Sequence, residues 1–436
     1  MNRFLLPSLV ALVASLLALP ISNAAPMAPA LDSDSALNQS DPATEHTATG
    51  VAALNVNDLD AAQAAFKEAT AANPRMPQPL LGLAEVAVRR GSRTEAKNWL
   101  DQAIRVAPYD DVARRALALF HITGKDYAAA EEALRETLTV NPRNLLAQID
   151  LADLYANSLN RPSEALIAYR AAVAIDPTHA GAHNGLATML TATGQFTEAE
   201  AEYRKAAELA PDVPVPLHLL ARMQLTRGQT QAGLVALDAA LKVQPTFVPA
   251  LLDKGDILLD HGKPEAAIEL YDQAVAADDK NAAAHYKRGA VLQLQRRDEE
   301  AKSEFLKAIA LDDKFVAAYA YNNLAWMTVE SGLNLDQAAN WADKAVKLEP
   351  DNAAFRDTQG WVYRAQRKLA EAETVLEKAA TMEPPVADIH YHLGMVYQDQ
   401  KKPDQARRAF DAALAIDPKH APSKAALQKL GDTVKQ

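Results

Sequence analysis

The sequence contains no cysteine, little glycine and few aromatic residues. Without cysteine it has no disulfide, no thiolate metal ligand and no cysteine nucleophile. Glycine occupies only 16 of 436 positions, which argues against a fold of many strands joined by tight turns. Aromatic residues make up 6% of a chain that is 49% hydrophobic, and much of the apolar remainder is alanine. This composition favours helices that pack at close range.

Basic residues are outnumbered, since 45 Lys and Arg face 56 Asp and Glu for a formal net charge of -11. Non-specific binding to nucleic acid needs a basic surface, so we expect no nucleic-acid partner. The sequence also lacks a phosphate-binding glycine loop, a nucleophile elbow and an HExxH motif. We therefore predict that the protein is not an enzyme and carries no cofactor.

Residues 1–24 are typical of a secretory signal peptide. Arg3 supplies the positive charge, an apolar run covers 4–21, and small residues at 22–24 suit cleavage. The alternative is an uncleaved membrane anchor, because the apolar run is about long enough to span a bilayer. Two prolines within the run favour removal. Residues 25–41 are small, polar and weakly acidic, and they are expected to form a disordered leader.

No later run of the sequence is both long and apolar enough to cross a membrane. We therefore expect an exported protein without stable membrane insertion after signal cleavage. The periplasm is the expected location, and an extracellular or outer-membrane-associated protein is the alternative.

A residue that ends a helix recurs at intervals of 34 residues, with one interval of 35 and one of 37. Proline fills most of these positions, and it ends a helix because it has no backbone N–H to donate. The series is Pro74, Pro108, Pro142, Pro177, Pro211, Pro245, Asp279, Asp313, Pro350, Pro384 and Pro418. A fixed period over most of a chain indicates a stack of repeated units with one continuous core.

Each period predicts two antiparallel helices, here called helix A and helix B. In residues 387–418, Leu393-Gly394 lies in helix A, while Ala406 and Phe410 lie in helix B. The small residues allow the two helices to touch, and a larger side chain there would cost about 1–3 kcal/mol through overpacking. The aromatic residue is expected to fill the space between neighbouring repeats.

The sequence therefore predicts an all-α solenoid of about eleven helix-turn-helix repeats over residues 42–418. The first repeat, 42–74, has a weak helix A and a good helix B. Residues 419–436 are expected to form a capping helix whose polar face protects the end of the stack.

At this point the chain resembles the tetratricopeptide repeat (TPR) family over residues 42–418. The tryptophan found early in helix A of the family is replaced here by Leu80, His183, Leu217, His285 and His390. The strings NNLAW and DTQGWVY resemble those of bacterial cell-envelope members, some of which serve polysaccharide export or sorting systems. The resemblance implies a right-handed superhelix whose helices A line a concave groove, and a scaffold that binds proteins without catalysing a reaction.

Candidate binding residues occur on the helices A of the last four repeats, at positions expected to face that groove. Aromatic residues and arginine are common energetic anchors of interfaces, and asparagine can pair with an extended peptide backbone. The alternative is that the tryptophans pack between repeats. The predicted partner site consists of Tyr286, Tyr319, Asn322, Trp326, Asp357, Trp361, Arg364 and Tyr391.

Two other kinds of site are not supported by the sequence. His390 and His392 form an HxH pair and His179 lies four residues before His183, but neither pair has an obvious third ligand, so no metal site is predicted. Some family members grip a carboxylate with lysine, asparagine and arginine from consecutive repeats, and that set is not found here.

The predicted function is a non-catalytic scaffold that binds a protein or peptide segment during cell-envelope assembly or secretion. One alternative is a component of an exopolysaccharide export or protein-sorting apparatus, which contacts glycan through Trp326, Trp361 and Tyr391. The alternative of another class is an enzyme with an unrecognised site.

Overall fold

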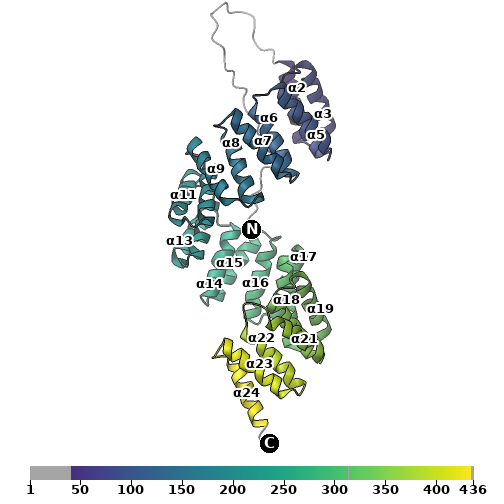
Figure 1. Ribbon diagram of the computed structural model, residues 1–436, viewed down its shortest axis with the longest axis vertical. Coiled ribbons are helices and arrows are strands. Elements are labelled where there is room, and N and C mark those ends of the chain that lie inside the picture. Colours follow the sequence, from purple (N-terminus) through teal and green to yellow (C-terminus); the bar gives the residue numbers. More distant parts are fainter. Residues whose placement is uncertain (1–40, 313, 434–436) are drawn as a thin grey trace, which may run out of the picture. The chain divides into compact units, whose positions relative to one another are not determined.

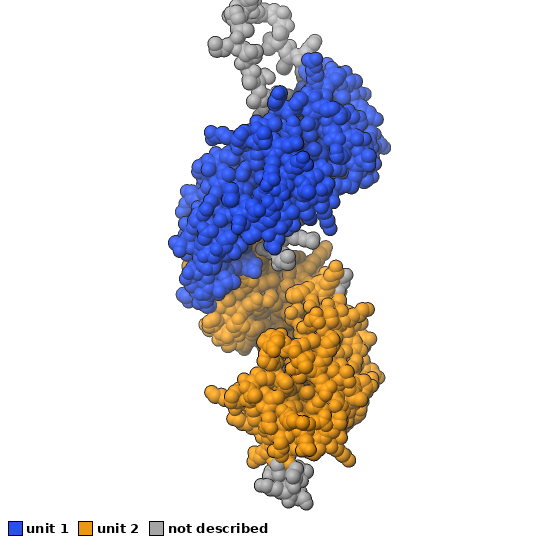
Figure 2. Space-filling view, viewed as in Figure 1, with its two compact units in different colours: residues 1–233 blue, residues 234–436 orange. Residues whose placement is uncertain are grey.

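The structure is a computed structural model, and it describes residues 41–312 and 314–433. Within these ranges every regular element is helical, as Figure 1 shows. The predicted signal peptide, 1–24, and all of the predicted leader except residue 41 lie outside the described residues. The chain divides into two compact units, one up to Gly233 and one from Leu234 onward (Figure 2).

Unit 1 contains the first helix pairs, and its last helix, α13, crosses the boundary to unit 2. The helices A are α2 (Pro42–Asn55), α4 (Pro77–Arg89), α6 (Asp111–Thr123), α8 (Leu145–Asp153), α10 (Ala180–Ala192) and α12 (Val215–Thr226). The helices B are α3 (Leu59–Ala72), α5 (Arg93–Val106), α7 (Tyr127–Val140), α9 (Pro162–Ile175), α11 (Phe196–Leu209) and α13 (Thr230–Val243).

Unit 2 continues the same alternation and ends with a single helix. Its helices A are α14 (Val248–Asp260), α16 (Ala282–Leu294), α18 (Phe315–Ser331), α20 (Ala353–Ala365) and α22 (Ala387–Asp399). Its helices B are α15 (Pro264–Ala277), α17 (Asp298–Leu311), α19 (Leu335–Leu348), α21 (Leu369–Ala380) and α23 (Pro403–Ile416), followed by α24 (Ala421–Thr433). The predicted all-α repeat fold with a final capping helix is thus confirmed.

The turn between helix A and helix B depends on one residue with positive φ. Glycine fills this position at Gly194 (φ 78°) and Gly262 (φ 69°), where it needs no Cβ. Other repeats place Lys125, Arg296 or Lys401 in the same left-handed conformation, at φ values of 59–61°. The turn geometry is therefore kept even where the sequence has no glycine.

The aromatic residue of helix B packs on the small residue of helix A. A Cβ added at Gly255 would lie 2.4 Å from Tyr271 Cε1, and Tyr271 is fully buried. Phe66 lies equally close to Gly50 in its own repeat and to Gly82 in the next. The aromatic ring therefore fills the seam within a repeat as well as the expected space between repeats.

Two repeats depart from the common spacing for different local reasons. The 35-residue interval contains a π-helical segment, Leu154–Ser158, directly after α8. Such a segment accommodates one extra residue within a helix. The 37-residue interval contains α18, which has 17 residues where α16 and α20 have 13.

Neighbouring repeats contact one another through helix B of one repeat and helix A of the next, and also directly through their helices A. In unit 2, α16 contacts α18, α18 contacts α20, and α20 contacts α22. No comparable contact joins consecutive helices B among the described residues. The helices A of unit 2 consequently form one continuous layer, and the predicted site residues all belong to this layer.

Candidate functional site

Three of the predicted site residues come together around a histidine on helices α18, α20 and α22. The ring centroid of His392 lies 4.3 Å from Trp361, 5.6 Å from Tyr391 and 6.0 Å from Trp326. We call Trp326, Trp361, Tyr391 and His392 the aromatic cluster. Sequence reasoning considered His392 only as a possible metal ligand and missed its position at the centre of this cluster.

His392 is held in place by Asp357, another predicted site residue. Its Nδ1 atom lies 2.8 and 2.9 Å from the two carboxylate oxygens of Asp357, so Nδ1 carries the proton and donates it. Both residues are buried. Arg115 and Asp150 in unit 1 form a buried pair at the same separation of 35 residues. Both pairs therefore join the helices A of neighbouring repeats.

Arg364 lies against the cluster and is already engaged. Its guanidinium carbon is 4.5 Å from the ring centroid of Trp361, and its Nε atom is 2.7 Å from Asp399 Oδ2. Trp361 therefore has two close neighbours at its ring, His392 and Arg364. A sugar ring would have little room to stack on this tryptophan.

Asn322 is a predicted site residue with a buried hydrogen-bond acceptor. Its Oδ1 atom is buried and accepts no hydrogen bond. The next residue, Asn323, instead donates from Nδ2 to Gln293 Oε1 at 3.0 Å. A buried acceptor without a donor costs free energy, so this oxygen is a cost to the fold.

Tyr286 and Tyr319 belong to a second row of rings. Tyr319 lies 6.1 Å from Tyr286 and 5.0 Å from the buried Phe355, and Tyr286 lies 5.8 Å from Phe305. Burial, followed by the neighbouring Tyr319, raises the pKa of the Tyr286 hydroxyl. These two tyrosines pack between repeats, and no ring contact joins them to the aromatic cluster within the described residues.

The histidines that replace the expected tryptophan early in helix A have a structural role in two repeats. His183 Nε2 lies 2.9 Å from the carbonyl oxygen of Pro177, and His285 Nε2 lies 3.0 Å from that of Asp279. Each ring also contacts a glutamate 19 residues further on. The sequence contains the same spacing of histidine and glutamate in both repeats, so the contact could have been predicted from it.

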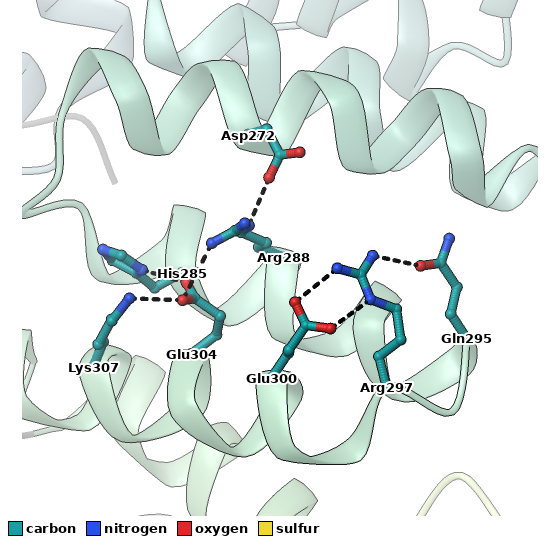
Figure 3. A network of polar contacts seen from close by, with 8 residues as sticks. All are labelled: Asp272, His285, Arg288, Gln295, Arg297, Glu300, Glu304 and Lys307. Carbon is teal, nitrogen blue, oxygen red and sulfur yellow. Dashed lines mark hydrogen bonds and ion pairs between the residues drawn. The ribbon is translucent and has the colours of Figure 1, made fainter.

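Figure 3 shows the second of these networks around Glu304. His285 Nδ1 lies 2.6 Å, Lys307 Nζ 2.8 Å and Arg288 Nη1 3.2 Å from the Glu304 carboxylate. Burial opposes ionisation, but the hydrogen bonds from Lys307 and His285 hold the pKa of Glu304 below its ordinary value. A carboxylate kept ionised by three donors stabilises the repeat and is poorly suited to proton transfer.

The described residues contain neither a cluster of metal ligands nor a helix suited to a membrane. No group of three or more His, Cys, Asp or Glu residues in this part of the chain is arranged to hold a metal ion. Among the same residues, no helix combines the length and the apolar character needed to cross a membrane.

Known proteins match the chain over several of its repeats. One tetratricopeptide repeat model matches residues 115–180 and 358–421, another matches 53–120 and 156–223, and a TPR repeat model matches 255–295. Cellulose synthase operon protein C of Pseudomonas fluorescens (strain SBW25) is 29% identical over 39% of this chain and 14% of that protein. Cellulose synthase 1 operon protein C of Komagataeibacter xylinus is 30% identical over 42% of this chain and 12% of that protein.

The chain thus spans about an eighth of the length of these two relatives. Among solved structures, the APC/C hetero-tetramer Cut9-Hcn1 is 14% identical, with a TM-score of 0.49, over 89% of this chain and 96% of that chain. The repeat models and the succession of helix pairs together show that the chain belongs to the tetratricopeptide repeat family.

Proposed function

We propose that this protein is a non-catalytic scaffold that binds a protein or peptide segment on the helix A layer of unit 2. The aromatic cluster carries this proposal, because three aromatic side chains from consecutive repeats gather around one buried histidine. The hydrogen bonds from His392 to Asp357 fix the cluster before any partner arrives. A preformed surface loses little conformational entropy on binding, which favours affinity.

The helix packing supports a groove as the place of binding. The helices A of unit 2 contact one another more closely than its helices B do. A stack of repeats curves toward the layer whose members lie closer together, so the helix A layer would form the concave side. Extended concave surfaces are the usual binding surfaces of such repeats.

The charged side chains around the cluster support binding over catalysis. Arg364 is paired with Asp399, and His392 with Asp357. Both carboxylates are therefore engaged by a neighbouring side chain, which leaves neither of them free to act as a general acid or base on a partner.

We further propose that the scaffold serves an exported assembly concerned with an exopolysaccharide, most simply in the periplasm. The two relatives named above are cellulose synthase operon proteins, and the N-terminal sequence is typical of a secretory signal. A component of an export or sorting apparatus is the second candidate. Direct glycan contact would more readily use Trp326 or Tyr391, since His392 and Arg364 already pack against the ring of Trp361.

The test compares partner capture by tagged full-length variants from a cell-envelope fraction. The Trp326→Ala variant is expected to lose at least about tenfold in capture of the wild-type partner, because an aromatic anchor of an interface contributes about 2 kcal/mol or more. Trp99→Ala is the matched control, since Trp99 lies on α5 in unit 1. Unchanged capture by a folded Trp326→Ala variant would refute this binding site.

A further inference from the structure

We infer that unit 1 contains a binding pocket of its own, which takes the carboxylate of an aspartate or glutamate side chain from a protein partner. The pocket is formed by α11, the end of α12 and the first residues of α13. All of its lining residues belong to unit 1, so the inference does not depend on the aromatic cluster of unit 2.

The pocket has a volume of about 610 Å³ and a largely polar lining. Glu200 and Arg204 come from α11 and Gln224 from α12, while Thr230 and Ala232 belong to the first turn of α13. The side chain of Arg204 is 60% exposed. A group that enters the pocket can therefore reach the guanidinium of Arg204.

The preceding repeat shows which group fits beside this arginine. Arg170 on α9 donates from Nη2 to both carboxylate oxygens of Glu198, at 3.0 and 2.9 Å. Glu198 lies in the first turn of α11. Arg204 follows Arg170 by 34 residues, and Ala232 follows Glu198 by the same number. The second position of this kind thus keeps the arginine and lacks the carboxylate.

Smaller side chains leave space where that carboxylate would lie. At the start of α13, Thr230 and Ala232 replace the larger Phe196 and Glu198 found at the start of α11. Both of the smaller residues line the pocket. The pocket therefore occupies the position that a first-turn glutamate fills one repeat earlier.

The N-terminus of α13 favours a negative charge and supplies none itself. In the part of the chain that the structure describes, every other helix B has an aspartate or glutamate at its N-cap or in its first turn. Such an acid is stabilised by the helix dipole and by backbone N–H groups that have no carbonyl partner within the helix. A partner's carboxylate would take this role at α13.

Arg204 is held only weakly in the absence of a partner. Its Nη2 and Nε atoms lie 2.8 and 3.2 Å from Oε1 of Glu200, one turn earlier on α11. An exposed pair within one helix contributes little to stability, so a bound carboxylate can compete for the arginine. Arg227, which directly precedes the lining residue Gly228, is exposed and adds a positive charge beside the pocket.

The same groups favour a carboxylate over a phosphate. A carboxylate accepts two hydrogen bonds from one guanidinium, as Glu198 does from Arg170. Glu200 stays at the edge of the site and repels a doubly charged phosphate more strongly than a singly charged carboxylate.

The inference can be tested with a positional-scanning library of immobilised, amidated 12-residue peptides and the labelled full-length protein. We expect pools with one fixed glutamate or aspartate to be enriched over pools with glutamine, asparagine or phosphoserine. In the best sequence, replacing that glutamate by glutamine should weaken binding about tenfold. Arg204→Gln and Ala232→Glu should each remove most of this difference, because the first removes the donor and the second places an internal carboxylate in the pocket.

Arg170→Gln is the matched control, because Arg170 already holds Glu198. It should keep the preference for glutamate, and circular dichroism should show that all three variants are folded. No preference for a carboxylate, a stronger preference for phosphoserine, or a preference that survives Arg204→Gln would overturn the inference.

Trp326→Ala separates this inference from the proposed function. A glutamate preference that needs Arg204 and persists in Trp326→Ala supports the pocket, whatever happens at the aromatic cluster. Peptide binding that is lost in Trp326→Ala and unchanged in Arg204→Gln overturns the pocket and leaves the proposed function standing.

Discussion

Replacing Asp153 by asparagine should stabilise unit 1 at neutral pH. Asp153 is the last residue of α8, directly before the π-helical segment, and it accepts a hydrogen bond from the Tyr169 hydroxyl. The nearby Asp150 is already paired with Arg115. Burial raises the pKa of Asp153 from 3.8 to about 6, although the hydrogen bond from Tyr169 opposes the rise. The ionised form of Asp153 therefore destabilises the folded chain.

The size and the sign of the effect follow from this pKa. A folded chain with the higher pKa binds the proton more tightly than the unfolded chain, so ionisation destabilises the fold. The penalty is absent below about pH 4, grows between about pH 4 and pH 6, and is complete above pH 6. A difference of about two pKa units corresponds to about 3 kcal/mol at pH 7.5 and about 1 kcal/mol at pH 4.5.

Asparagine has no charge to bury and keeps an acceptor for the Tyr169 hydroxyl. Urea unfolding of the full-length chain, followed by far-UV circular dichroism, should therefore show a larger gain in midpoint for Asp153→Asn at pH 7.5 than at pH 4.5. Hydrogen exchange of peptides from α8 and α9 would locate the gain, since a long repeat array need not unfold in one step.

Asp212→Asn is the control for this experiment, because Asp212 is exposed in the loop between α11 and α12. It should leave the midpoint nearly unchanged at both pH values. A lower midpoint for Asp153→Asn at pH 7.5, or an equal gain at both pH values, would refute the reasoning from burial.

Two further predictions concern packing between helices. Gly255→Leu should lower the melting temperature, because overpacking against Tyr271 costs about 1–3 kcal/mol. Adding Tyr271→Ala should recover part of the lost stability. Melting curves that show no recovery would contradict the assigned contact. Arg115→Leu should lower the stability by about 3–5 kcal/mol, because it leaves Asp150 buried without its cation. The double change of Arg115 and Asp150 to leucine should cost far less in the same melting measurement. If the losses of stability from the two single changes simply add in the double variant, this explanation is excluded.

The period of the sequence predicted most of the fold. Each repeat must satisfy two local requirements by itself. It needs proline or aspartate at the end of helix B, and small residues where the two helices of a pair touch. Helix ends and pair packing therefore appear directly in the spacing of Pro418, Gly394 and Phe410. The two irregular intervals were equally visible, but the sequence did not distinguish the π-helical segment after α8 from the longer helix α18.

The candidate site could be predicted only in part. Helical spacing placed Trp326, Trp361 and Tyr391 on the helices A of successive repeats, and the structure brings these three together. The same reasoning grouped Tyr286 and Tyr319 with them, but the rings of those tyrosines pack with each other and with Phe305 and Phe355 instead. Binding through any of these residues stays a prediction.

What the sequence determined by itself was the repeat, because each helix pair is specified by residues within about 34 positions of one another. Only the tertiary structure decided that His392 packs near two tryptophans and donates to Asp357, 35 residues earlier. Such a contact depends on how one repeat is rotated against the next. That rotation is set by the combined packing of many small side chains, so no single sequence motif predicts it.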